Sequence, residues 1–498
     1  MNEITNKTAI ELNQAFLNKN LSAQEITQAF LQQIENYNKD INAFISVNAD
    51  MALARAQDLD SKLAKGETLG KLAGVPIGIK DLINYTGTET TAASKMLKGH
   101  KSTYNATITQ KILDAGAIPL GKLNLDEFAM GSSNEKSAFG NCLNPWNPKC
   151  VPGGSSGGSA AAIAARMAPL TFGTDTGGSI RQPASYCGIA GMKPTYGKVS
   201  RYGIIAFASS LDQAGPMTMN VEDNALLMEV MSGHDPKDST SLNLPQENYL
   251  QGIESGFKKT QSLKGLRIGI AAEFFSDTVN SEVKAAVENA IKHYQSLGAE
   301  TVAIDFNKIK YGLPTYYIIA PSEASSNLAR YDGVRFGHRN KEAESLTDLY
   351  FKSRTEFGDE VKRRIMIGVY ALSSGYYDAY YKKAQQVRRL IYNDFEKAFT
   401  KCDLIISPTA PATAFEAGSK SADPLEMYLS DIMTVTINLA GLPGMSINCG
   451  FDGKGLPIGM QLIAPALKES TIYNAAYAFE STTDFVKSPD LEKLFAVK

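Results

Sequence analysis

The residues best suited to chemistry are gathered in one segment, Val151–Ala184. It holds two clusters of glycine and serine, Gly153–Ser159 and Gly173–Ser179, on either side of an alanine-rich run. Gly/Ser repeats usually form flexible linkers. A linker, however, does not run directly into a small-residue helix that is followed by a second glycine cluster. The segment therefore predicts loops of a folded core that present serine hydroxyls.

Three short matches to catalytic motifs lie nearby, and each lacks part of its context. Gly153–Gly157 fits G-x-S-x-G, but three prolines in the preceding residues argue against the strand that this motif requires. Gly116–Lys122 resembles a phosphate loop, yet Leu123 stands where Ser or Thr would hold magnesium. Ser133–Lys136 fits S-x-x-K without the accompanying K-T-G element. None of the three predicts an activity.

Strand and helix patterns alternate along the chain around this segment. We expect a short buried strand at 74–80 that ends on Lys80, a helix at 106–115 and a strand at 117–120. Leu266–Ala271, Glu282–Leu297 and Thr301–Phe306 predict a β-α-β unit, and further strands are expected at Asp403–Ser407, Gly444–Cys449 and Ile458–Ile463. The alternation predicts an α/β fold, a mixed central sheet covered by helices on both faces.

We expect one domain over residues 1–498, made of six successive parts. These are N-terminal helices at about 1–70, a catalytic core at about 71–232, a polar excursion at about 233–264, a β-α-β part at about 265–306, a helical insertion at about 307–400 and the completion of the core at about 401–498. Within the first part, Ser22 and Glu25 have the spacing of a helix capping box.

Composition excludes several classes of protein. Lys and Arg total 50 against 52 Asp and Glu, a net charge of −2, so a dedicated nucleic-acid binder is not expected. Five scattered cysteines without a C-x-x-C pair are typical of a reduced, cytoplasmic protein. The four histidines are also isolated, which argues against a metal hydrolase and predicts no metal site.

Three separated elements together resemble a known family. Gly153–Ala165 and Gly173–Ala184, with the sequence GIKD (Gly78–Asp81) upstream, are similar to the defining signature of the amidase signature family of amide hydrolases. The similarity extends over essentially the whole chain. The resemblance implies an amidase-signature fold with a helical insertion and a Ser-cisSer-Lys catalytic unit. It places the nucleophile at Ser179, the bridging serine at Ser155 and the base at Lys80.

These residue types fit the chemistry. A serine hydroxyl is a poor nucleophile until a base removes its proton, and a lysine can be that base only if burial keeps it neutral. Ser155 can donate and accept a hydrogen bond at once, so it can pass a proton from Ser179 to Lys80. The glycines beside the nucleophile leave backbone N–H groups open. The predicted oxyanion hole consists of the N–H groups of Thr176, Gly177, Gly178 and Ser179.

Further segments resemble the tRNA-dependent amidotransferases within this family: 122–135, 198–216, 322–337 and 360–388. That resemblance implies hydrolysis of glutamine, with the ammonia used to convert glutamyl-tRNA(Gln) into glutaminyl-tRNA(Gln). It further implies a heterotrimer with B and C subunits, in which ATP, Mg²⁺ and most of the tRNA are held by the B subunit. No cofactor is then expected on this chain.

Glutamine is a zwitterion, so its site should offer a cation for the α-carboxylate and an anion for the α-ammonium group. The resemblance places these at Arg364 and Asp431, with Tyr316 helping to position the substrate. Arg363 and Tyr317 are the neighbouring alternatives.

Two other functions remain open at this point. A stand-alone amidase of the same family would use Lys80, Ser155 and Ser179 on a small amide without partners. A non-catalytic scaffold would only organise a tRNA complex, but the presence of all three catalytic residue types argues against it.

Overall fold

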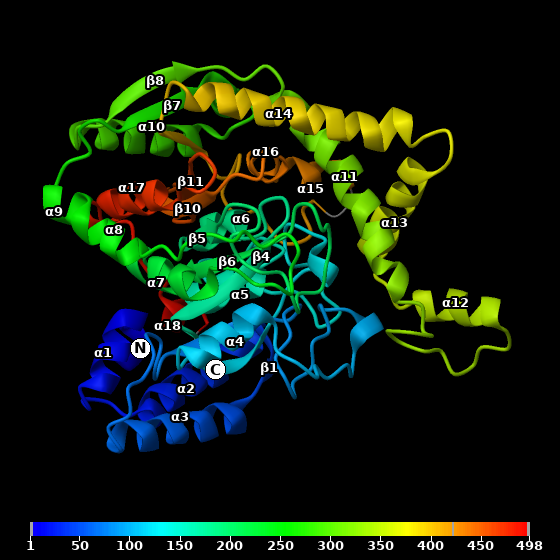
Figure 1. Cartoon of the computed structure of the whole chain (residues 1–498), viewed down its shortest axis with the longest axis horizontal. Helices are drawn as coiled ribbons and strands as arrows, with labels where there is room; N and C mark the ends of the chain where they lie inside the picture. Colours follow the sequence, from blue (N-terminus) through cyan, green and yellow to red (C-terminus); the bar gives the residue numbers. More distant parts are fainter. Residues whose placement is uncertain (1–2, 421–422, 496–498) are drawn as a thin grey trace.

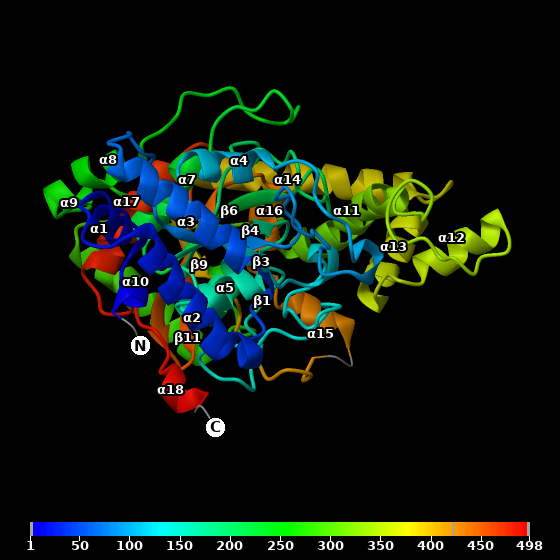
Figure 2. The same ribbon diagram turned by 90° about the horizontal axis from the view of Figure 1, so that it is seen from below.

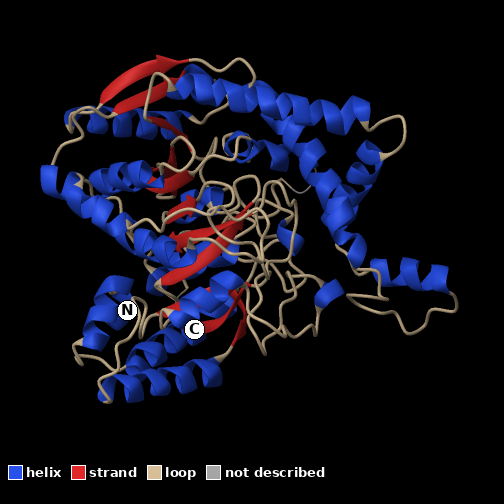
Figure 3. Cartoon of the chain, in the orientation of Figure 1, coloured by secondary structure: helices blue, strands red, loops and turns tan. Residues whose placement is uncertain are grey.

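The computed structural model describes residues 3–420 and 423–495, and its strands form one mixed sheet (Figure 3). In these ranges eleven strands follow the spatial order β1-β3-β2-β4-β6-β5-β10-β11-β9-β7-β8. They are β1 (Phe44–Val47), β2 (Pro76–Lys80), β3 (Ile118–Leu123), β4 (Leu170–Asp175), β5 (Ala190–Lys193), β6 (Gln213–Thr218), β7 (Arg267–Ala271), β8 (Glu300–Ile304), β9 (Leu404–Pro408), β10 (Gly444–Phe451) and β11 (Pro457–Ile463). The predicted mixed α/β fold is confirmed.

The direction of the strands decides where a site can form. β2 runs parallel to both of its neighbours, β3 and β4, and β7 runs parallel to β8 and β9. The other pairs of neighbouring strands are antiparallel. Because the carboxyl ends of parallel strands meet at one edge of a sheet, the residues that end β2 and β4 are brought close together.

The helices surround this sheet (Figure 1). They are α1 (Ala9–Leu17), α2 (Ala23–Ile41), α3 (Ala49–Ala64), α4 (Thr107–Asp114), α5 (Gly157–Ala164), α6 (Arg181–Cys187), α7 (Val221–Met231), α8 (Tyr249–Ser255), α9 (Phe257–Thr260), α10 (Ser281–Ser296), α11 (Gly312–Asn327), α12 (Leu346–Arg354), α13 (Asp359–Leu372), α14 (Lys383–Phe399), α15 (Pro424–Leu429), α16 (Val435–Leu439), α17 (Glu469–Ser481) and α18 (Leu491–Leu494), with a π-helical turn at Asp378–Lys382.

Helices cover both faces of the sheet. On one face lie α5 and α6, and the N-terminal end of α5 comes so close to β4 that a Cβ at Gly173 would lie 2.6 Å from the Ser156 hydroxyl oxygen. On the other face, α7, α17 and α10 pack side by side, and the ring of Tyr294 stacks on that of Phe479. The core therefore lies on both sides of the central strands.

The predicted N-terminal part is mainly helical, and it also supplies an edge strand. The Ser22 hydroxyl accepts the N–H of Glu25 and the Glu25 carboxylate accepts the N–H of Ser22, which confirms the capping box. β1, which was not predicted, pairs antiparallel with β3. In the segment predicted as a polar excursion, α8 and α9 bury Tyr249 and Phe257, so this stretch packs on the core.

Three central strands, β4, β5 and β6, were not predicted. They are short, contain Gly or Pro and are buried on both faces, as the burial of every residue in each strand shows. A strand covered on both faces lacks the alternation of polar and apolar residues by which strands are recognised in a sequence. Missing β4 affected the prediction of the site as well, because this strand carries two residues of the site.

Helices α11 to α14 form an arm beside the sheet, and α12 lies at its outer end in both views (Figures 1 and 2). α11 contacts α13, α14 and α16, which joins the arm to the rest of the chain. Over the described residues, no helix combines the length and the apolar character needed to cross a membrane.

Candidate active site

Two strand ends and one loop meet at the carboxyl edge of β2 and β4. Lys80 ends β2, Ser155 and Ser156 precede α5, and Thr174 lies near the end of β4. The Nζ atom of Lys80 lies 2.9 Å from the Ser155 hydroxyl, 2.8 Å from the Ser156 hydroxyl and 2.8 Å from the Thr174 hydroxyl. The structure thus brings together the predicted base and the predicted bridging serine, and adds two hydroxyls that the sequence did not indicate.

The environment of Lys80 favours the neutral amine. Burial lowers its pKa to about 7, although the nearby carboxylates of Asp126, Asp175 and Asp212 act in the opposite direction. In the described part of the chain no carboxylate pairs directly with Nζ, and its hydrogen bonds all go to hydroxyl oxygens. Near neutral pH a large fraction of Lys80 can therefore accept a proton.

The hydrogen bonds of Ser156 restrict how that amine is oriented. Its hydroxyl donates to the carbonyl oxygen of Thr174 at 3.2 Å, so its oxygen must accept from Lys80. A neutral amine has two N–H groups and one lone pair. When the second N–H is donated to Thr174, the lone pair faces Ser155, which is the direction that a relay of protons requires.

The loop before α5 is held in an unusual backbone form. The Gly154–Ser155 peptide bond is cis. A Cβ at Gly154 would lie 2.1 Å from Asp126 Oδ2, so only glycine fits there. Asp126 in turn accepts the backbone N–H groups of Asn134 at 2.9 Å and Lys136 at 3.1 Å, and this fixes the neighbouring loop.

Ser179 lies in the turn between β4 and α6 and is half-buried. The N–H of Ser156 donates to its carbonyl oxygen at 3.2 Å, which joins the two serine loops. Within the described ranges the Ser179 hydroxyl has no hydrogen-bond partner. Lys80 and Ser155 are therefore hydrogen-bonded to each other, whereas Ser155 and Ser179 are not. Catalytic hydrogen bonds are often long in the absence of substrate.

Of the four N–H groups in the predicted oxyanion hole, one already has an acceptor in this structure. The N–H of Gly178 donates to Asp175 Oδ1 at 2.8 Å, so it is already engaged. The N–H groups of Thr176, Gly177 and Ser179 have no acceptor among the described residues and remain the candidate donors. Gly178 has a φ of +133°, and a Cβ there would lie 2.2 Å from Thr434 Oγ1, so glycine is required.

Arg364 and Asp431, the predicted ligands of the glutamine zwitterion, lie in one buried group. Arg364 is 3 % exposed and its neighbour Arg363 is 43 % exposed, so of the two arginines Arg364 is the one whose side chain is buried in this group. Its Nε donates to Glu360 at 2.8 Å, and its guanidinium lies 5.3 Å from the ring centre of Tyr317. Among the described residues its remaining N–H groups have no acceptor, which leaves them available to a carboxylate.

Asp431 is the matching buried anion. It accepts the Ser132 hydroxyl at 2.6 Å and the Tyr317 hydroxyl at 3.3 Å. Burial raises its pKa to about 7, with these hydrogen bonds and Arg364 acting against the rise. Tyr317 therefore contacts both the cation and the anion. Tyr316 lies instead against the nucleophile loop, where a Cβ at Gly177 would approach its ring to 2.6 Å.

Known proteins are similar to this chain over most of its length. A sequence profile of the family described as Amidase matches residues 25–473. The chain belongs to the amidase signature family. It is 56 % identical over 474 residues to the A subunit of glutamyl-tRNA(Gln) amidotransferase from Thermosynechococcus vestitus, covering 95 % of this chain and 97 % of that one. Over 488 residues it is 54 % identical to the protein of that name from Thermoanaerobacter pseudethanolicus, covering 98 % of each chain.

A solved structure supports the same relationship. The crystal structure of the glutamyl-tRNA(Gln) amidotransferase A subunit from Thermotoga maritima superposes with a TM-score of 0.80 at 39 % identity, covering 98 % of both chains. The fold is therefore common to this chain and to that protein over nearly their whole lengths.

This amidase also contains a buried ion pair that sequence reasoning missed. Asp175 accepts Nε and Nη2 of Arg181 at 3.0 and 3.1 Å, and also the Asn438 side chain at 2.8 Å. Burial opposes ionisation of Asp175, but Arg181 lowers its pKa to about 2. The pair fixes the turn that carries Ser179. Both residues lay in the segment singled out from the sequence, but nothing in their spacing indicated that they pair.

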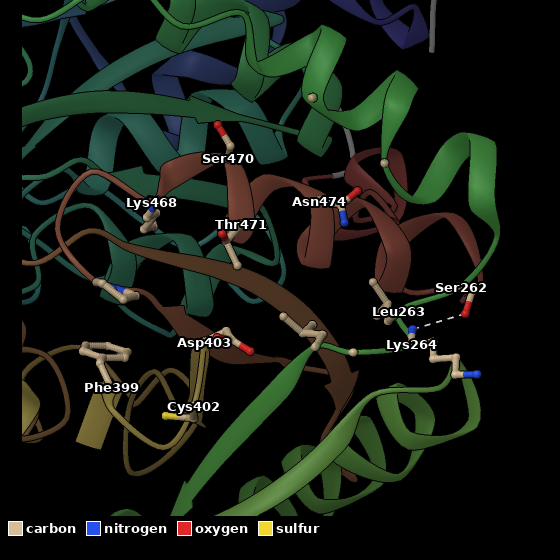
Figure 4. A pocket seen from close by; sticks show the side chains of 15 residues that line it. Ser262, Leu263, Lys264, Phe399, Cys402, Asp403, Lys468, Ser470, Thr471 and Asn474 are labelled. Atoms are coloured by element: carbon tan, nitrogen blue, oxygen red, sulfur yellow. Dashed lines mark hydrogen bonds between the residues drawn. The ribbon is translucent and has the colours of Figure 1, made fainter. Parts of the chain in front are cut away.

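A separate cavity of about 660 Å³ lies between the start of β9, the loop 262–266 and α17 (Figure 4). Two of its polar side chains have partners: Asp403 pairs with Arg267 at 2.7 Å, and the Asn474 side-chain oxygen accepts the N–H of Phe257 at 2.7 Å. None of its lining residues belongs to the Lys80 or Arg364 groups. In the described ranges no cluster of three His, Cys, Asp or Glu side chains is arranged to hold a metal ion.

Proposed function

We propose that this protein is the glutamine-hydrolysing component of a tRNA-dependent amidotransferase. The observation that carries the proposal is the buried pair of opposite charges, Arg364 and Asp431, beside the loop that holds Ser179. A simple amide would not need both charges, whereas the α-carboxylate and α-ammonium of glutamine match them. The names of the closely similar relatives support the same assignment.

In the proposed reaction Lys80 begins as the neutral amine. Ser179 gives its proton to Ser155 as Ser155 gives its own to Lys80, and the Ser179 oxygen attacks the δ-carboxamide carbon of glutamine. The carbonyl oxygen becomes an oxyanion that accepts the open N–H groups of the turn. The proton returns to the leaving nitrogen, the C–N bond breaks, and ammonia departs to leave a γ-glutamyl ester on Ser179.

Water completes the cycle. It loses a proton to the same relay and attacks the ester, the C–O bond to Ser179 breaks, and the serine recovers its proton as glutamate is released. For the first step to occur, the hydroxyl of Ser179 must rotate toward Ser155, because the two are not hydrogen-bonded in this structure.

The ammonia then serves a second reaction on a partner. We expect a cytoplasmic heterotrimer with B and C subunits, in which the B subunit holds ATP, Mg²⁺ and most of the glutamyl-tRNA(Gln), while this chain binds no cofactor. The net charge of −2 supports this division, because tight binding of tRNA requires many phosphate contacts from Lys and Arg.

The test is to purify the chain from its own cells and to assay amidation of glutamyl-tRNA(Gln) with glutamine and with ammonium salts. We expect the B and C subunits to accompany the chain, and a γ-glutamyl adduct on Ser179 in quenched enzyme by mass spectrometry. A chain that purifies alone and hydrolyses a small amide would indicate a stand-alone amidase. A complex that uses ammonium but never glutamine would indicate a scaffold.

A further inference from the structure

Helix α13 has two faces of different character. Its inner face presents Arg364 and packs on α11 at Gly368, where a Cβ would lie 2.0 Å from the Pro321 carbonyl oxygen. Its outer face carries Met366, Val369 and Tyr370, which are 71 %, 57 % and 50 % exposed. Residues three or four positions apart lie on the same side of a helix, so these three form one apolar stripe.

The stripe continues into the turn after the helix. The ring of Tyr370 lies 4.5 Å from that of Tyr376 and 5.8 Å from that of Tyr380, and both of these side chains are also exposed. We call this set, Met366, Val369, Tyr370, Tyr376 and Tyr380, the outer patch. Contiguous exposed apolar groups of this kind mark interaction sites. α13 lies on the side of the arm that faces away from the sheet (Figure 1).

The chemistry of the outer patch indicates what binds there. Methionine and tyrosine are enriched in protein–protein interfaces. Lys362 precedes Met366 by one helical turn and Lys383 follows Tyr380 by three residues, and in the described part of the chain neither ammonium group pairs with a carboxylate. Asp378, which stands between Tyr376 and Tyr380, is exposed, but its charge is matched by Lys382 at 3.0 Å, so Lys362 and Lys383 leave the border of the apolar patch with a net positive charge. Two copies meeting face to face would bring these lysines together, which disfavours self-association.

We propose that the outer patch is the surface on which this chain binds another polypeptide of the amidotransferase, one that presents an apolar centre bordered by acidic residues. The inference rests on the proposed function, which supplies that partner. Because the same helix presents Arg364 on its opposite face, the bound polypeptide is separated from the glutamine carboxylate site by a single helix.

The experiment titrates purified chain into the purified B and C subunits. Met366→Glu and Tyr370→Glu place a charge in the apolar centre, and Lys383→Glu reverses an exposed charge of the border without touching the helix packing. Met51→Glu on α3, another exposed methionine on a helix, is the matched control. We expect each patch variant to weaken binding at least about tenfold, and the control to change it less than about twofold.

The outcomes separate this inference from the proposed function. Loss of binding in the patch variants, with unchanged glutamine hydrolysis by the isolated chain and unchanged thermal unfolding, supports the inference. Patch variants that bind the B and C subunits as the wild type does would overturn it and leave the proposed function intact. A wild-type chain that binds neither of them would overturn both. Self-association or tRNA binding that depends on the patch would assign it to another occupant and overturn the inference.

Discussion

Two buried basic side chains in this molecule, Lys80 and Arg364, have surroundings that favour opposite charge states. Lys80 contacts hydroxyl groups only, so burial lowers its pKa to about 7 and favours the neutral amine. Arg364 donates to the carboxylate of Glu360 and lies over the rings of Tyr317 and Tyr428, so its charge is matched. One molecule therefore holds a lysine that can be neutral near pH 7 in one region and an arginine whose charge is matched in another.

The difference lies in the partners rather than in the degree of burial. A buried lysine with no paired carboxylate gives up its proton most easily, whereas a guanidinium cannot do so in the accessible range of pH. Aromatic faces and a carboxylate stabilise the charged form of arginine. Substitutions at either cation, or at the groups that surround it, should therefore affect glutamine hydrolysis in different ways.

The largest effect is expected from Lys80→Arg. The variant keeps a cation among the hydroxyls but removes the neutral base, so hydrolysis of glutamine should fall by about 10³-fold. The measurement is ammonia release by the purified complex, with circular dichroism to establish folding. Amidation supported by added ammonium should persist, because that reaction bypasses this site. A folded variant that retains most of its hydrolysis would show that Lys80 is not the base.

The second prediction concerns the other cation and its partner anion. Arg364→Ala or Asp431→Asn should raise the KM for glutamine about ten- to a hundredfold, since hydrogen bonds to charged groups contribute about 1.5–3 kcal/mol. kcat should change much less. Steady-state kinetics with glutamine measure this, and ammonium-dependent amidation is the internal control.

Arg363→Ala is the matched variant for that pair, because Arg363 is adjacent in sequence and also pairs with Glu360 but is 43 % exposed. Its KM for glutamine should stay close to the wild-type value. If Arg363→Ala and Arg364→Ala behaved alike, the buried guanidinium would hold the arm in place and would not be the ligand of the α-carboxylate.

The sequence predicted the mixed fold and the elements that carry Lys80 and Ser155, because both follow recognisable local patterns. It did not predict β4, whose residues are buried on both faces, and so it missed Thr174 as a contact of Lys80. The bond between Ser132 and Asp431 joins residues 299 positions apart. Contacts of this kind depend on how the arm packs, which no local pattern records. The roles of the site residues stay predictions.

The third prediction is a pH profile. Below about pH 7 Lys80 is protonated and cannot accept a proton, and Asp431 is protonated and cannot pair with the α-ammonium of glutamine. Each protonation lowers kcat/KM for glutamine, so kcat/KM should rise as the pH increases through about 7. In Asp431→Asn the KM should lose its dependence on pH while kcat keeps its acid limb. A profile that is flat between about pH 5.5 and 9 would contradict both assignments.

The smallest expected effect belongs to Thr174→Val, which removes one of the three hydroxyls around Lys80. The hydroxyl stabilises the ammonium form, so its loss should lower the pKa of Lys80 further and move the acid limb of kcat to lower pH. The substitution also frees the amine to turn away from Ser155, which should reduce kcat about fivefold, the equivalent of one hydrogen bond of about 1 kcal/mol.

Thr171→Val is the control, because Thr171 is also buried in β4 but bonds to the Ser159 carbonyl. It should lower thermal stability without moving the limb. If both variants shifted the acid limb of kcat equally, the Thr174 hydroxyl would not orient the lone pair of Lys80. Burial alone would then account for the neutral amine.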